Sequence, residues 1–214
     1  MWCLFIAGGF LWGNVLFSEI ITRRVKKQDV FNASDDGNPG TVNAFKICGV
    51  KWGLLCLFLD ALKGFLPVLL ATLLLNAHSW AMMFVVIAPV AGHAMGIYNG
   101  FRGGKCIAVS FGVLFGLLPV TWAALLLALP YVLFSTLIKI RPNGVRSIIV
   151  YTIFGLSALG LCVSQNLLPI GVGCVLIAVT VITKHAIKLK EEIAREKGLE
   201  FETDDGEELE NERN

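Results

Sequence analysis

Long apolar stretches dominate the chain, and polar residues gather between them. The apolar runs cover residues 2–22, 48–75, 79–98, 105–137, 147–163 and 165–184. A transmembrane helix needs about 20 mostly apolar residues, with a lower limit near 17, so every run is long enough to cross a membrane. The pattern therefore predicts an all-α polytopic membrane protein.

The run 105–137 is too long for one helix, and the charges at its ends decide how it divides. The basic residues that flank it are Arg102, Lys105, Lys139, Arg141 and Arg146. Basic residues favour the cytoplasmic side of a membrane, and two basic ends on one side require an even number of crossings. We therefore expect two short helices that turn near residues 117–120, where Pro119 breaks the helix.

With this division the chain has seven transmembrane helices, two of them short, and its basic connections fall on one side. The connections 76–79 and 164–166 contain no Lys or Arg, which predicts an N-terminus outside and a C-terminus in the cytoplasm. We expect one membrane domain over residues 1–187 and a charged cytoplasmic tail over residues 188–214. In that tail the sequence predicts a short helix at 188–195 and then an acidic, disordered end.

Composition supports this fold class and excludes several others. Of the 214 residues, 56% are hydrophobic and 16% charged, whereas soluble domains carry about 25% charged residues. The net charge is only +2, so we expect no nucleic acid as a partner. The six cysteines lie mostly singly in apolar runs, and no two histidines have metal-ligand spacing. We therefore expect no metal and no cofactor.

The first polar loop, residues 35–43, reads Asp-Asp-Gly-Asn-Pro-Gly-Thr-Val-Asn, and Lys46 follows it. Its glycines allow backbone amides to turn inward around an anion, and its Asn side chains add donors. A tight Asn-Pro-Gly turn between two helices explains the same residues. On spacing alone, the turn is the better interpretation.

A second polar loop follows Gly92 and His93 and reads Phe-Arg-Gly-Gly-Lys over residues 101–105. Gly-Gly-Lys at a helix N-terminus directs free N–H groups, the positive end of the helix dipole and an ammonium group to one point. That combination suits a phosphate group, although the full P-loop pattern is absent. Anchoring of the loop at the membrane surface, with glycines for helix packing, is an equally good interpretation.

Ionisable residues inside the apolar runs supply a third signal. Asp60 and Lys63 lie three residues apart on one helical face, and we expect them to form a structural ion pair. His93 could donate to a phosphate or be a satisfied structural residue. His185 lies just past the last run, at the level of both polar loops, and Glu19 receives no chemical role.

These segments resemble the PlsY-type glycerol-3-phosphate acyltransferases of bacteria, which are integral membrane enzymes with seven helices and an outward N-terminus. The matched positions are Gly37, Asn38, Pro39, Gly40, Asn43, Gly53, Leu54, Leu55, Asp60, Ala61, Leu62, Lys63, Gly64, Gly92, His93, Gly103, Gly104, Lys105 and Ala108. They fall in three segments, in the family's order.

The resemblance implies an enzyme of the bacterial plasma membrane with its active site facing the cytoplasm. It would transfer an acyl group from acyl phosphate to the 1-hydroxyl of glycerol 3-phosphate, giving lysophosphatidic acid and inorganic phosphate. Glycerol 3-phosphate, acyl phosphate and membrane lipids would be its partners, and neither a metal nor a cofactor would be needed. Transfer of the family's site onto this chain assigns catalytic roles to His185, Lys46 and Asp36. It assigns substrate binding to Gly37, Asn38, Gly40, Asn43, His93, Arg102, Gly103, Gly104 and Lys105.

The chain also departs from the family pattern. Asp36 stands where the family has Ser, Lys46 where it has Arg, Cys106 where it has Gly, and Lys188 where it has Asn. The family's Gly-x-Glu corresponds to residues 198–200 only with an insertion. These departures leave open a non-catalytic member that binds a lipid phosphate or a partner protein, and Asp60 with Lys63 leaves a small transporter as a third reading.

Overall fold

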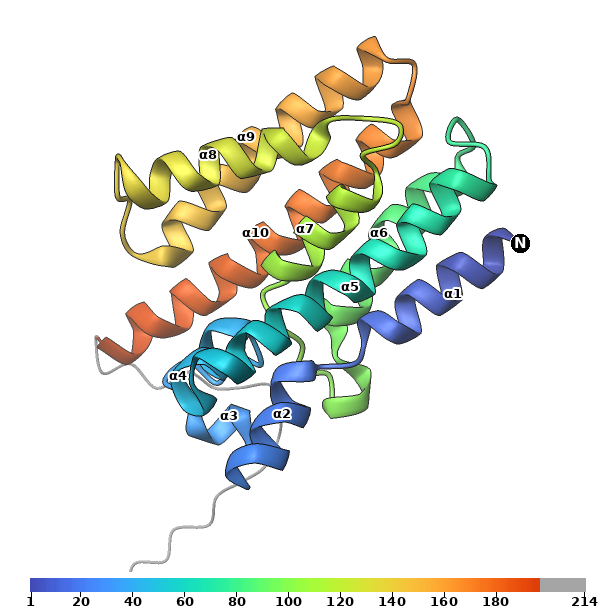
Figure 1. The fold of residues 1–214 in the computed structure, drawn as a ribbon. Helices are drawn as coiled ribbons and strands as arrows, with labels where there is room; N and C mark the ends of the chain where they lie inside the picture. Colours follow the sequence, from blue (N-terminus) through green and yellow to red (C-terminus); the bar gives the residue numbers. More distant parts are fainter. Residues whose placement is uncertain (197–214) are drawn as a thin grey trace, which may run out of the picture.

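The computed structural model describes residues 1–196, and within them the secondary structure is entirely helical. The elements are α1 (Trp2–Gly13), α2 (Phe17–Lys26), α3 (Val30–Ala33), α4 (Thr41–Cys48), α5 (Val50–Leu74), α6 (Ala81–Met95), the 3₁₀ turn η1 (Ile97–Asn99), α7 (Ile107–Gly116), α8 (Ala123–Thr136), α9 (Asn143–Ser164) and α10 (Leu168–Glu196). The longer helices form an elongated bundle, with α2, α3 and α4 at one end and the N-terminus at the other (Figure 1).

Five segments of the described chain are long and apolar enough to cross a membrane. They are Trp2–Lys26, Val50–Leu74, Ala81–Asn99, Asn143–Ser164 and Leu168–Arg195. The shorter apolar helices α7 and α8 complete the predicted set of seven. The multi-pass all-α fold predicted from the sequence is therefore confirmed.

The predicted division of the run 105–137 is also confirmed. Helix α7 ends at Gly116, and α8 begins at Ala123. The chain reverses between them (Figure 1), so the α8–α9 connection lies at the same end of the bundle as α2–α4. With 10 and 14 residues, the helices are only about 15 and 21 Å long, shorter than a hydrocarbon core of about 30 Å.

The first apolar run is not one continuous helix, because it breaks at residues 14–16. The Asn14 side chain accepts a hydrogen bond from the Ile97 amide at 2.7 Å. The Val15 carbonyl accepts one from the Lys63 ammonium at 2.6 Å. Both partners are far away in the sequence, so the local pattern contains no signal for the break. Beyond it, Glu19 accepts a bond from the Val30 amide at 2.9 Å and anchors the connection to α3.

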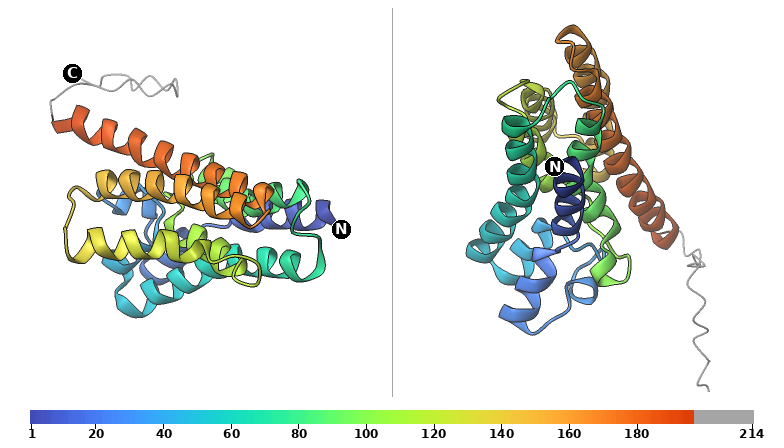
Figure 2. Two further views of the ribbon diagram at one scale, coloured as in Figure 1. Left: turned by 90° about the horizontal axis from the view of Figure 1, so that it is seen from above. Right: turned by 90° about the vertical axis from the view of Figure 1, so that its right-hand side faces the viewer.

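The last apolar run continues further than its hydropathy indicates. Helix α10 extends without interruption to Glu196, so the short helix predicted at 188–195 is its final part. Figure 2 shows the C-terminal end of α10 projecting past the other helices of the bundle. The predicted disordered end, and the match at residues 198–200, lie outside the described residues.

Small residues let the helices approach closely. A Cβ on Gly112 of α7 would lie 1.9 Å from the Ala61 carbonyl oxygen of α5, and one on Gly64 would lie 2.4 Å from the Val109 carbonyl oxygen. Close backbone contact of this kind is the usual basis of helix association in membranes. It fixes the start of α7, and with it the adjoining polar loop.

Candidate functional site

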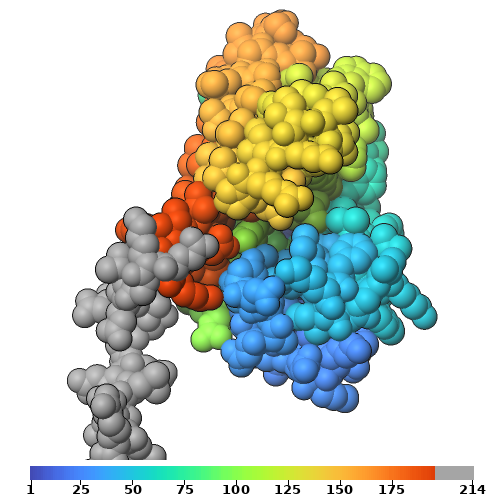
Figure 3. Space-filling model, turned by 90° about the vertical axis from the view of Figure 1, so that its left-hand side faces the viewer, coloured from blue at the N-terminus to red at the C-terminus, as the bar shows by residue number. Residues whose placement is uncertain are grey.

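Two polar loops and α10 meet at the end of the bundle that holds α2–α4. One loop lies between α3 and α4, and the other between η1 and α7. Figure 3 looks at this end and shows a hollow between the α8–α9 connection in yellow and the α3–α4 region in blue, with the green segment that leads into α7 at its floor. The candidate site residues line this part of the molecule.

The α3–α4 loop is a tight turn, as its Asn-Pro-Gly sequence indicates. Gly37 adopts a φ of +56°, which favours glycine. The Gly40 amide donates to the Asn38 carbonyl at 2.8 Å, and Gly40 then caps α4. The turn holds Asp36, Asn38 and Asn43 together around one point.

Asp36 is the centre of this group. Its carboxylate accepts hydrogen bonds from the Asn43 side-chain amide at 2.7 Å and from the Asn38 amide at 3.2 Å. Its second oxygen lies 2.8 Å from the Lys105 ammonium, with both side chains partly exposed. The ion pair therefore joins the two loops that the sequence singled out.

Opposing effects act on the pKa of Asp36. Burial of the carboxyl raises its pKa. The hydrogen bond and charge of Lys105 and the amides of Asn43 and Asn38 lower the pKa, and together they outweigh the effect of burial. The net pKa lies below the ordinary value of an aspartate. Asp36 is therefore ionised at neutral pH and is a weak proton acceptor.

The second loop is fastened to the end of α6. The Gly104 amide donates to the His93 carbonyl at 3.0 Å. A Cβ on Gly103 would lie 1.9 Å from the Ala94 carbonyl oxygen, and one on Gly104 would lie 2.3 Å from His93 Nε2. Both positions therefore need glycine for steric reasons. Lys105 follows directly, before α7, whose N-terminus has no side-chain cap. The uncapped N–H groups and the ammonium of Lys105 form a positively charged corner.

His93 belongs to a buried ion network behind the loop. Lys63 Nζ lies 2.8 Å from Asp60 Oδ1 and 2.8 Å from His93 Nδ1. Asp60, Lys63 and His93 are at most 4% exposed. The predicted Asp60–Lys63 pair is thus present, and His93 accepts a hydrogen bond from the ammonium through Nδ1. Its other nitrogen faces Gly104, so the network supports the second polar loop from behind.

His185 lies on α10 and is 3% exposed. Neither of its ring nitrogens has a hydrogen-bond partner among residues 1–196, and its ring experiences the charges of Lys105, Asp36 and Arg146. An imidazole with both nitrogens free, beside a charged site, is available to bind a substrate hydroxyl. Lys188 is one turn further along α10 and pairs with Glu191.

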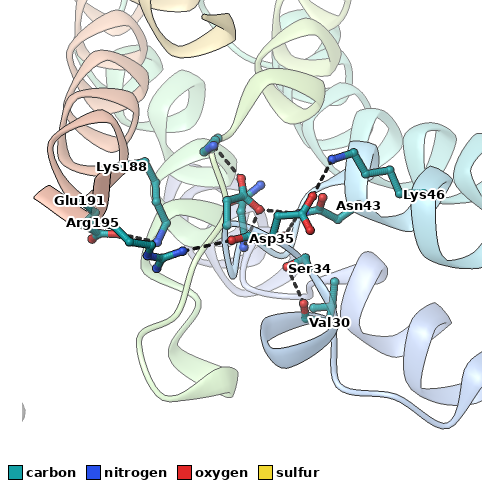
Figure 4. Close-up of polar contacts among 11 residues, drawn as sticks. Val30, Ser34, Asp35, Asn43, Lys46, Lys188, Glu191 and Arg195 are labelled. Atoms are coloured by element: carbon teal, nitrogen blue, oxygen red, sulfur yellow. Dashed lines mark hydrogen bonds and ion pairs between the residues drawn. The ribbon is translucent and has the colours of Figure 1, made fainter. Parts of the chain in front are cut away.

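Lys46 and Arg102 lie outside this centre. Lys46 pairs with exposed Asp35 at 3.1 Å, and Figure 4 shows this contact beside the α10 residues Lys188 and Arg195. The Arg102 guanidinium lies 5.5 Å from the centre of the Phe31 ring. The structure therefore brings together Asp36, Asn38 and Asn43 of the first loop with Gly103, Gly104 and Lys105 of the second. It places Lys46 and Arg102 at the rim.

Some residues at this end were missed in the sequence analysis as site residues. Arg195 donates to the Asp35 carbonyl at 3.4 Å (Figure 4), and the charge of Arg146 acts on His185. Their positions depend on how far α10 extends and where α9 begins, which hydropathy alone does not specify. Among residues 1–196, no group of three or more His, Cys, Asp or Glu side chains could hold a metal ion.

Comparison with known proteins places this arrangement in one family. The family model described as glycerol-3-phosphate acyltransferase matches residues 3–195. A glycerol-3-phosphate acyltransferase of Aquifex aeolicus is 39% identical over 110 residues, which cover 51% of this chain and 56% of that protein. Glycerol-3-phosphate acyltransferase 2 of Thermotoga maritima is 34% identical over 146 residues, which cover 65% of this chain and 74% of that protein. The aligned part thus spans little more than half of the Aquifex relative.

Solved structures cover nearly the whole chain. The crystal structure of PlsY, an integral membrane glycerol 3-phosphate acyltransferase, in its glycerol 3-phosphate form has a TM-score of 0.75 and 28% identity, over 94% of each chain. Its lysophosphatidic acid form has a TM-score of 0.73 over the same share. On the family match and this agreement of fold, the chain belongs to the glycerol-3-phosphate acyltransferase family.

Proposed function

We propose that the protein transfers an acyl group from acyl phosphate to the 1-hydroxyl of glycerol 3-phosphate, the first step of membrane phospholipid synthesis. The new ester bond forms between the acyl carbon and the glycerol oxygen, and the bond from the acyl carbon to the phosphate oxygen breaks. The hydroxyl proton leaves with the inorganic phosphate, and lysophosphatidic acid is the other product. The observation that carries the proposal is the Asp36–Lys105 pair, which unites the two polar loops in one site.

Both substrates carry phosphate groups, and the centre of the site offers donors for them. Lys105 supplies a charge, α7 supplies N–H groups without a side-chain cap, and Asn43 and Asn38 supply amides. Gly103 and Gly104 hold the second loop against α6, and Gly37 and Gly40 form the turn of the first loop, so that these donors face one site. A phosphate group would replace the Asp36 carboxylate as the partner of Lys105, because both are anions that compete for the same ammonium.

His185 would bind the acceptor hydroxyl, take up its proton and pass it to the leaving phosphate, since its ring nitrogens have no partner among residues 1–196. Asp36 would act by holding Lys105 and Asn43 in place until the substrate arrives. His93 would position the Gly103–Gly104 backbone through its contacts with Lys63 and Gly104. Lys46 and Arg102 would attract anionic substrates to the rim, since Lys46 is exposed and Arg102 lies at the same end.

We place this end of the bundle in the cytoplasm and the N-terminus outside, because the connections at this end carry the basic residues. The host membrane would be the plasma membrane of a bacterium. Asn76→Cys and Gln28→Cys, in a background with Cys3 and Cys48 changed to serine, test the orientation. A membrane-impermeant maleimide added to intact cells should label position 76 and leave position 28 unlabelled; the reverse pattern contradicts the assignment.

The direct test of the reaction uses purified full-length protein in phosphatidylcholine nanodiscs with palmitoyl phosphate and labelled glycerol 3-phosphate. Labelled lysophosphatidic acid should form, together with an equal amount of inorganic phosphate. Palmitoyl-coenzyme A in place of palmitoyl phosphate should give none. Product from the coenzyme A thioester alone would overturn the assignment of acyl phosphate as the donor.

The same ion pair favours a second candidate, a non-catalytic family member that binds a lipid phosphate or a partner protein. In that case Asp36 occupies Lys105 permanently, and Lys188 stands where the reaction would need the side-chain amide of the family's Asn. The double variant Asp36→Ser/Lys188→Asn should then gain acyl transfer that the wild type lacks. Equal activity of the two proteins would argue against this candidate.

A further inference from the structure

The connection between α8 and α9 forms an open cavity of about 510 Å³, whose lining residues include neither Asp36 nor Lys105. Its lining residues are Ser135, Lys139, Ile140, Arg141, Pro142, Asn143 and Arg146. Three of these side chains are cations. Their sequence positions alone are explained by anchoring at the membrane surface, but the fold turns all of them toward one cavity.

No carboxylate among residues 1–196 neutralises these cations, since the ion pairs of the described chain involve other residues. Arg146 lies with its guanidinium 5.6 Å from the centre of the Tyr131 ring, which fixes its position without offsetting its charge. Its Nε is buried and has no hydrogen-bond partner in the described chain. Arg146 therefore lines the cavity with a charge that no carboxylate of the described chain offsets, and one of its donors is desolvated and unsatisfied.

The start of α9 adds further donors to the same cavity. Pro142 is its N-cap and makes no side-chain capping bond, so the first N–H groups of this 22-residue helix have no side-chain partner. Pro142 and Asn143 line the cavity. The positive end of the helix dipole thus adds to the cations, which is the arrangement that binds phosphate groups.

The surroundings of the cavity indicate where its ligand resides. Leu137 and Ile138, directly before Lys139, are 79% and 57% exposed. Earlier in α8, Leu129 and Val132 are 65% and 60% exposed. Such an apolar surface faces lipid in a membrane protein. The cavity lies where this surface ends, which is the level of the lipid headgroups.

From these contacts we infer a second phosphate-binding site, formed by Lys139, Arg141, Arg146 and the N-terminus of α9, that holds the phosphate group of an anionic membrane lipid. Free inorganic phosphate offers the same chemistry, but it lacks the acyl chains that the exposed face of α8 would contact. The inference does not depend on the proposed reaction, because Lys139 and Arg141, the two residues changed in its test, have no role in that reaction.

The test measures binding of dioctanoyl phosphatidic acid to full-length protein in detergent by calorimetry. A Lys105→Ala background removes the main cation of the candidate active site, so that binding reports on the cavity. In this background, Lys139→Gln/Arg141→Gln should weaken binding about tenfold, because hydrogen bonds to charged groups are lost. Both side chains are exposed, so the substitutions leave the core intact.

Arg24→Gln/Lys26→Gln is the matched control, because it removes two exposed cations at the same end of the bundle and none from the cavity. It should leave the affinity within about twofold, the range of general surface attraction. Equal losses in the two double variants would overturn the site. Full displacement of the lipid by an equal concentration of inorganic phosphate would overturn the lipid as its ligand, and retention of the lipid supports it.

Discussion

The carboxylate of Asp36 and the ammonium of Lys105 lie 2.8 Å apart and join loops that are 69 residues apart in the sequence. The pair brings the positively charged corner at the start of α7 against the Asn-Pro-Gly turn. It also places a negative charge where a substrate phosphate would bind, so Asp36 both assembles the site and competes for its main cation.

Replacement of Asp36 by serine should therefore release Lys105. We expect the KM for glycerol 3-phosphate to fall about tenfold, because a charge-assisted hydrogen bond then becomes available to the substrate. Asp35→Ser is the matched control, since the exposed Asp35 carboxylate pairs with Lys46 at the rim, and the backbone carbonyl that Arg195 contacts is kept in the variant. Steady-state kinetics of both variants in nanodiscs check this, and equal effects at the two positions would contradict it.

Asp36 also makes stability depend on pH. Its pKa is lower in the folded protein than in the unfolded chain, so its stabilising effect is fully present above the ordinary value of about 3.9. The effect disappears as the pH falls through the lowered pKa. Below about pH 4 the midpoint of thermal unfolding should fall more steeply for the wild type than for Asp36→Asn. Parallel curves for the two proteins would refute this role.

The buried network behind the loop should be sensitive to loss of one charge. Lys63→Met leaves Asp60 buried without its cation and removes the bonds to His93 and Val15. We expect a loss of about 3–5 kcal/mol in the free energy of unfolding. Asp60→Asn/Lys63→Met removes both charges and should recover much of this loss. Unfolding in mixed detergent micelles measures both, and a double variant less stable than Lys63→Met would contradict the explanation.

Contact between α5 and α7 predicts a contrast between two glycines. Gly112→Ala places a methyl group against the Ala61 carbonyl, where a Cβ would lie at 1.9 Å, and should destabilise the fold by about 1–3 kcal/mol. Gly160, in α9, has open space around its missing Cβ. Its change to alanine should be neutral or stabilise the helix by up to about 1 kcal/mol. The same unfolding assay tests both; equal stability of the two variants would count against close packing at Gly112.

If His185 accepts the proton, its replacement should affect the chemical step more than substrate binding. His185→Ala should lower kcat by a factor of about 10²–10⁴, the usual contribution of general acid–base catalysis, with a smaller change in KM. His78→Ala serves as the control, because His78 lies in the α5–α6 connection, where it contacts the Asn166 carbonyl at the opposite end of the bundle. A loss confined to KM would assign His185 to substrate binding instead.

Hydropathy and charge were sufficient to predict the long apolar helices and the reversal between α7 and α8, but not the short helices α3 and α4. The reversal was predictable because both ends of the run 105–137 are basic, and that signal lies within the sequence itself. The break at residues 14–16 was not, since it depends on distant donors at Lys63 and Ile97. The continuation of α10 to Glu196 was missed because its last turns are charged and packing, not hydropathy, decides their conformation.

The candidate site shows the same division. The Asn-Pro-Gly turn was predictable because it depends on local backbone geometry, and for the same reason Gly-Gly-Lys indicated a candidate phosphate-binding loop. The resemblance assigned Asp36 a catalytic role, but its ion pair with Lys105 was not predictable, because adjacent Asp35 has the same side chain and pairs with Lys46 instead. The cavity at Arg146 was also not predictable, because it forms only when α8 and α9 meet.

The central claim is that Lys105 binds the substrate phosphate during acyl transfer. Its most direct test is the rate of lysophosphatidic acid formation from palmitoyl phosphate and glycerol 3-phosphate by Lys105→Ala and by the exposed control Lys26→Ala, each in nanodiscs. The account predicts a loss of at least about 100-fold for Lys105→Ala and an unchanged rate for Lys26→Ala. Full activity of a folded Lys105→Ala protein would contradict it.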